Sequence, residues 1–133
     1  MTELGLQSQS NNRYQRFLKK IVEQGFVYAF LGNGQIKAWV ANELHCDEGK
    51  PMPLIVIWSN QAYPKAWISD HAEQELKLIP IPLDELHGLL DQFAENGFGI
   101  GAEWNQKGFG VELTTDQFRD DVTRVMTELY GDT

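Results

Sequence analysis

The sequence predicts a single α+β domain, in which a mainly antiparallel, twisted sheet of about five to six strands packs against about four helices. Amphipathic helix patterns alternate with two strand–turn–strand patterns, whose turns lie at residues 32–34 and 105–108. One continuous apolar run rich in β-branched residues, at 53–59, predicts the central strand. The expected organisation is a flexible N-terminal tail over residues 1–11 and one domain over residues 12–133.

The first elements follow from the residues in chain order. Apolar residues recur at helical spacing from Tyr14 to Val22, so a helix is expected over about 13–24, with Asn12 as its cap and Gly25 at its end. Residues 26–31 and 35–41 predict a hairpin around a Gly-Asn-Gly turn. A loop over 42–52 is expected to lead into the central strand.

The second half begins with a short helix that Ser59 and Asn60 can cap. A strand follows at 76–81, and its prolines indicate a sheet edge. A leucine stripe between Pro82 and Gly97 predicts the third helix, and strands at 98–104 and 109–113 form a second hairpin. Thr114 caps the last helix, whose expected inward-facing residues are Phe118, Val122, Val125, Met126 and Leu129.

Charge is unevenly distributed along the chain, whose formal net charge is −8. Residues 1–66 contain seven Lys or Arg against five Asp or Glu, whereas residues 67–133 contain four against fourteen. An acidic half repels phosphate backbones, so no nucleic-acid partner is expected. The acidic C-terminal half is either a set of solvated helix faces that keep the protein soluble or a surface for a basic protein partner.

The expected compartment is the cytoplasm. Cys46 is the single cysteine, which excludes an intrachain disulfide and fits a reducing environment. No apolar run approaches the roughly 20 residues that a membrane helix requires, so no membrane partner is expected. The sequence contains no cofactor-binding motif, so no cofactor is expected.

Several short motifs, taken in order, match a known family. They are Tyr14-x-x-Phe17-Leu18, Trp58-Ser59 after the central strand, Pro82-Leu83-Asp84-Glu85-Leu86, and Ile100-Gly101-Ala102-Glu103-Trp104. Over about residues 12–122 the chain resembles the bacterial family catalogued as domain of unknown function 2750. The resemblance supports the fold assignment and implies no activity, substrate or site residue.

One candidate binding surface comes from the last hairpin and the last helix. Gly97, Gly99 and Gly101 alternate along one strand face, which either lets a ligand or partner backbone approach or seats another element of the fold. Trp104 ends the strand, where a half-exposed indole could anchor a partner. Asp120 and Asp121 supply acidic groups on the last helix.

A second candidate lies on the third helix. Asp84, His87 and Asp91 are spaced i, i+3, i+7, so they share one flank, where they could hold a metal or make the histidine a general base. A solvated flank explains the same spacing without chemistry. The adjacent residues His45, Cys46, Asp47 and Glu48 are too close in sequence to converge on one ion, so no metal is assigned there.

These observations favour a non-enzymatic cytoplasmic protein-binding or regulatory module, of the immunity type, that acts through its acidic half. The alternative is a small metal-dependent hydrolase that uses Asp84, His87 and Asp91. A homo-oligomeric scaffold is also compatible with the sequence.

Overall fold

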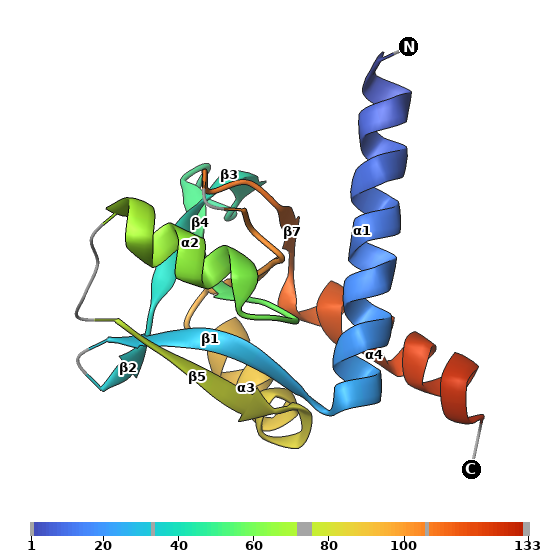
Figure 1. The fold of residues 1–133 in the computed structure, drawn as a ribbon. Coiled ribbons are helices and arrows are strands. Elements are labelled where there is room, and N and C mark those ends of the chain that lie inside the picture. The colour runs from blue at the N-terminus through green and yellow to red at the C-terminus, as the bar shows by residue number, and fades with distance from the viewer. Residues whose placement is uncertain (1, 33, 72–75, 106, 132–133) are drawn as a thin grey trace.

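The computed structural model describes residues 2–32, 34–71, 76–105 and 107–131, and over these residues the chain forms four helices and seven strands (Figure 1). The predicted α+β class is confirmed. The helices are α1 (Thr2–Gln24), α2 (Ala62–His71), α3 (Leu83–Glu95) and α4 (Thr115–Tyr130). The strands are β1 (Phe26–Gly32), β2 (Gln35–Ile36), β3 (Ala38–His45), β4 (Pro51–Ile57), β5 (Lys77–Pro82), β6 (Gly99–Ala102) and β7 (Val111–Leu113).

The strands form two sheets, which corrects the prediction of a single sheet with about five to six strands. The smaller sheet has the order β2-β1-β5, and the larger has the order β3-β4-β6-β7, in which β4 and β6 are parallel. The division arises because the strand predicted over 35–41 breaks at Lys37. Gln35 and Ile36 pair with β1, and the chain then crosses to pair with β4. The Gly-Asn-Gly turn itself includes residue 33, which lies outside the described residues.

Helix α1 begins at Thr2, not at about Arg13 as predicted, so the backbone expected to form a loose tail is helical. Glu, Leu and Gln in this segment have high helix propensity, and extending a formed helix costs much less than nucleating one. Asn12 therefore lies inside the helix and does not cap it. Figure 1 shows the N-terminal turns of α1 projecting beyond the rest of the fold. Gly25, at φ 85°, ends the helix as predicted.

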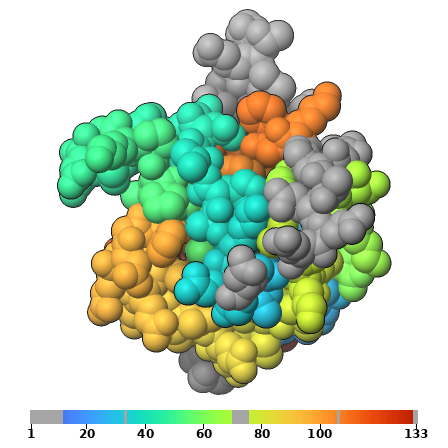
Figure 2. Space-filling view, turned by 90° about the vertical axis from the view of Figure 1, so that its left-hand side faces the viewer, coloured from blue at the N-terminus to red at the C-terminus, as the bar shows by residue number. Residues whose placement is uncertain are grey.

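The loop predicted over 42–52 is reduced to a turn over residues 46–50, because β3 and β4 extend into it. Figure 2 shows this turn standing out from the molecule. The extension of β3 depends on Glu112 of β7, whose carboxylate accepts the backbone N–H groups of Asn42, Glu43 and Leu44 at 2.8–2.9 Å. Three successive N–H groups around one anion form a nest. Glu112 thus draws together the two edge strands of the larger sheet.

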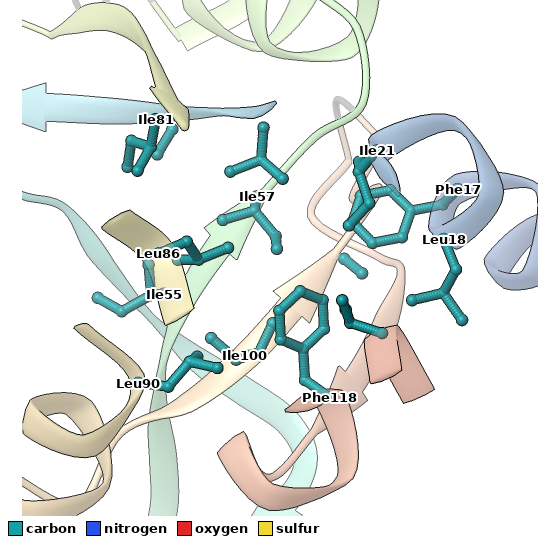
Figure 3. Packing of buried hydrophobic residues seen from close by; sticks show 14 of the residues in the cluster. Phe17, Leu18, Ile21, Ile55, Ile57, Ile81, Leu86, Leu90, Ile100 and Phe118 are labelled. Carbon is teal, nitrogen blue, oxygen red and sulfur yellow. The ribbon is translucent and has the colours of Figure 1, made fainter. Parts of the chain in front are cut away.

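Strand β4 is the centre of the larger sheet, as predicted, and it separates two hydrophobic cores. Leu54, Val56 and Trp58 belong to the smaller core, against which α2 packs. Ile55 and Ile57 belong to the larger core, where Figure 3 shows them facing side chains of α1, α3 and α4. A strand buried on both faces needs the continuous apolar run that the sequence contains.

The end of α3 and the start of α4 lie where the sequence predicts. Thr114 and Gln117 form a reciprocal capping box at the start of α4. Gly97, at φ 79°, follows the end of α3. The prediction that Met126 and Leu129 of α4 face inward is wrong, because both side chains are exposed. Neither of these two residues belongs to the larger core.

None of the helices in the described part of the chain combines the length and hydrophobicity needed to cross a bilayer.

Candidate functional site

The glycine face of β6 is filled by the protein's own side chains. Gly99 and Gly101 are buried, and a Cβ at Gly101 would lie 2.8 Å from Trp104 Nε1. A Cβ at Gly99 would lie 2.6 Å from the backbone oxygen of Leu113. Gly97 lies outside the strand, in the turn after α3. Of the two interpretations of this face, the structure supports packing, because no room is left for a ligand beside Gly99 or Gly101.

Trp104 is buried, not half-exposed as predicted, with 4% of its surface accessible. Its Nε1 donates to the backbone oxygen of Val111 at 3.2 Å, and its own backbone oxygen accepts Trp58 Nε1 at 2.7 Å. The glycines of β6 leave the space that the indole fills. Trp104 is therefore part of the smaller core and cannot anchor a partner from the surface.

The two acids of α4 have different surroundings. Asp120 is exposed, whereas Asp121 is partly buried and accepts the hydroxyl of Tyr14 at 2.7 Å. Burial of Tyr14, together with this hydrogen bond to a carboxylate, raises the pKa of the tyrosine far above its usual value. Asp121 thus holds α1 against α4, and Asp120 remains available to solvent.

Asp84, His87 and Asp91 do not form a convergent cluster. Asp91 pairs with Arg119 of α4 at 2.7 Å, while Asp84 and His87 line a groove. Among the described residues there is no group of three or more His, Cys, Asp or Glu side chains that could hold a metal ion. His45 contacts the backbone oxygen of Glu43 within β3, and Cys46 contacts that of Lys50 across the following turn. The metal-dependent hydrolase has no ligand set in the described part of the chain.

The groove between α3 and α4 is an apolar hollow on the surface. It has a volume of about 410 Å³, and its lining residues are Leu83, Asp84, His87, Leu90, Phe118, Arg119, Val122 and Met126. Leu90 and Phe118 form the floor from opposite helices, and both are seen in Figure 3. Met126 stands at the wall with 45% of its surface accessible. The sequence indicated both apolar stripes, but it did not indicate that they diverge enough to leave this hollow.

The groove is bordered by acidic helices. Helix α3 contains Asp84, Glu85, Asp91 and Glu95 and has no Lys or Arg. Helix α4 contains four acids and two arginines. Arg119 lines the groove and pairs with Asp91 through Nη2, while its buried Nε has no hydrogen-bond partner among the described residues. Arg124 bonds Glu128 and Gln15. The two helices together therefore carry a net negative charge, because eight acids outnumber two arginines.

Comparison with known proteins gives a family and a weak structural likeness. The model of a protein family described as "Protein of unknown function (DUF2750)" matches residues 14–122. No curated protein matches the chain. A solved structure described as "Anabaena Tic22 (protein transport)" is similar, with a TM-score of 0.46 and 9% sequence identity over 90% of this chain and 55% of that chain. The chain thus spans about half the length of that protein.

Proposed function

The chain belongs to the DUF2750 family of proteins of unknown function, and we propose that it is a protein-binding module whose α3–α4 groove takes a basic amphipathic helix of a partner protein. The observation that carries the proposal is the apolar groove flanked by helices of net negative charge. The acidic half retains the role expected from the sequence, while the contact surface moves from Trp104 to this groove.

The shape of the groove suits a helix better than a flat surface. Two helices form its walls, and their side chains Leu83, Leu90 and Phe118 provide an apolar floor. A bound helix places residues at i, i+3 or i+4 and i+7 along such a groove, where they replace water against apolar side chains. Met126 supports this mode, because a flexible thioether adapts to the shape of the incoming side chains.

Charge selects which helix binds. Asp84 lies in the first turn of α3 and lines the groove, and Glu85 follows it on the exposed surface. A partner helix with Lys or Arg on the margins of its apolar stripe would meet these carboxylates, whereas an acidic helix would be repelled. Arg119 also lines the groove, but its charge is paired with that of Asp91. Exposed charge pairs are screened by salt, so the affinity should fall as ionic strength rises.

The test is binding of a designed Leu/Lys amphipathic peptide, about 18 residues or five helical turns long, measured by fluorescence anisotropy. A Leu/Glu peptide with the same apolar pattern serves as the charge control. We expect saturable binding of the Leu/Lys peptide, weakened by salt, and no binding of the Leu/Glu peptide. Equal binding of both peptides would refute the electrostatic selection.

A pair of neighbouring substitutions tests the location. Met126→Lys places a positive charge in the groove wall, whereas Thr127→Lys places the same charge about 100° further round α4, away from the residues that line the groove. We expect Met126→Lys to weaken the Leu/Lys peptide at least about tenfold, equivalent to about 1.4 kcal/mol. Thr127→Lys should change the affinity by less than about twofold. Equal effects of the two variants would place the peptide elsewhere.

A further inference from the structure

A second pocket lies on another side of the fold, where α1 meets the C-terminal ends of β4 and β6. It has a volume of about 320 Å³ and is lined by Arg13, Arg16, Phe17, Lys20, Ser59, Asn60, Tyr63 and Glu103. Because β4 and β6 are parallel, the residues that follow them, Ser59 and Glu103, emerge at the same edge of the sheet. In open sheets, ligands commonly bind outside the carboxyl ends of parallel strands.

Glu103 is held in a conformation that a non-glycine residue seldom adopts. Its φ is 54°, in the left-handed region, which costs of order 1–3 kcal/mol and is commonest at functional sites. The carboxylate is buried, with 8% of the residue accessible, and accepts the N–H and the hydroxyl of Ser59 at 2.7 and 3.0 Å. Both carboxylate oxygens therefore have partners, and the buried charge is fixed in place on the pocket floor.

Arg13 lies in the pocket between Glu103 and Tyr63. It donates to the backbone oxygen of Glu103 at 2.5 Å, and its guanidinium lies 4.8 Å from the centre of the Tyr63 ring. This arginine is therefore held by the hydrogen bond and by a cation–π contact. Its positive charge offsets that of the buried carboxylate close by.

Two further cations, Arg16 and Lys20, line the same pocket. Arg13, Arg16 and Lys20 are spaced i, i+3, i+7, which places them on one face of α1. Within the part of the chain that the structure describes, neither Arg16 nor Lys20 makes a hydrogen bond or an ion pair, and both are exposed. Three cations against one carboxylate leave a local excess of two positive charges, in a protein with a net charge of −8.

We propose that this pocket binds the phosphate group of a small phosphomonoester. A phosphomonoester carries about −1.5 to −2 charges at pH 7, which matches the local excess. Arg16 would bind two phosphate oxygens through its planar guanidinium, and Lys20 would act as a point charge. The Oδ1 atom of Asn60 accepts the N–H of Ala62 at 2.9 Å, which leaves its Nδ2 group to donate to the ligand.

The site would have been difficult to find from the sequence. The four basic residues between Arg13 and Lys20 have the spacing of an ordinary solvated helix face. Ser59 was expected only as a helix cap, and Glu103 belonged to a strand. Their convergence depends on the parallel pairing of β4 with β6, which no local pattern predicts. The phosphate site is independent of the α3–α4 groove, so either proposal can fail alone.

The test uses inorganic phosphate as the probe, titrated at constant ionic strength against chloride and followed by the backbone amide signals in NMR spectra. We expect saturable shifts confined to Ser59, Asn60, Gln61 and the face of α1 that lines the pocket, with a dissociation constant of about 1 mM, equivalent to about −4 kcal/mol. Glycerol 3-phosphate should give the same pattern and glycerol none. Shifts that rise linearly with phosphate, or that are spread over other cations, would overturn the proposal.

Two charge-matched double variants provide the control. Arg16→Gln with Lys20→Gln removes the two exposed cations that line the pocket, whereas Lys19→Gln with Lys50→Gln removes two exposed cations that do not line it. We expect the first pair to weaken phosphate binding at least about tenfold, and the second to change it by less than about twofold. Equal weakening would show that net charge alone attracts the anion, and the site would be rejected.

Discussion

Replacing Gly101 by alanine tests whether Trp104 packs on β6. The added Cβ would lie 2.8 Å from Trp104 Nε1 and 3.0 Å from Val56 Cγ2, distances that are shorter than van der Waals contact. The indole would have to move, and its hydrogen bond to Val111 would be strained or lost. Overpacking typically costs about 1–3 kcal/mol, and a net hydrogen bond contributes about 1 kcal/mol. The lower backbone entropy of unfolded alanine returns about 0.4–1 kcal/mol.

The expected net loss in free energy of unfolding is therefore about 1–3.6 kcal/mol. Urea denaturation, followed by tryptophan fluorescence and circular dichroism, measures it. Gly88→Ala is the matched control, because Gly88 lies within α3 and a Cβ there would meet no atom within 4 Å. This control should be more stable than the wild type by up to about 1 kcal/mol. Wild-type stability of Gly101→Ala would refute the packing of Trp104 and restore an open glycine face.

Three other substitutions test separate parts of the fold. Thr114→Ala removes the capping box of α4 and should cost about 1 kcal/mol in urea denaturation, whereas Thr127→Ala, on the exposed side of the same helix, should change stability by less than about 0.5 kcal/mol. Glu112→Gln loses charge-assisted bonds to the β3 backbone and should cost about 1–3 kcal/mol, with faster amide hydrogen exchange in β3; unchanged exchange would contradict the nest. In the folded state Tyr14 keeps its proton above the usual tyrosine pKa of about 10. Its contribution to stability is therefore complete below pH 10 and declines at higher pH by up to about 1.4 kcal/mol per pH unit. This slope should be absent from Tyr14→Phe, and an identical slope in both proteins would show that the phenol is not buried.

Local patterns in the sequence predicted the elements whose boundaries have local causes. The continuous run at 53–59 gave the central strand, and Thr114 with Gln117 gave the start of α4. Gly25 and Gly97 gave two helix ends, since both adopt a positive φ. In each case the signal lies within a few residues of the feature it determines.

Features that depend on distant residues could not be predicted in this way. The break of the second strand at Lys37 depends on the competition between β1 and β4 for neighbouring residues. The length of β3 depends on Glu112, about 70 residues away in sequence. Trp104 was expected at the surface because a strand end beside a turn is commonly exposed, but glycines on β6 made room for its ring.

The candidate surfaces differ between the sequence prediction and the structure because they, too, depend on residues that are distant in sequence. Asp84 and His87 both line an apolar groove between α3 and α4, whereas the spacing in the sequence indicated only that they share one flank of a helix. Asp91, the third residue of the predicted cluster, forms an ion pair with Arg119 of α4. The spacing along one helix predicts which side chains are neighbours. It does not predict what the adjacent helix contributes.

The most direct test of the central proposal is an NMR map of the surface that contacts the Leu/Lys peptide. The proposal predicts that the largest amide shifts during titration occur in α3 and α4, at the residues that line the groove, including Leu83, His87, Phe118 and Met126. Shifts centred on other elements, or scattered over exposed acids such as Asp47 and Glu48 with little change in the groove, would contradict it.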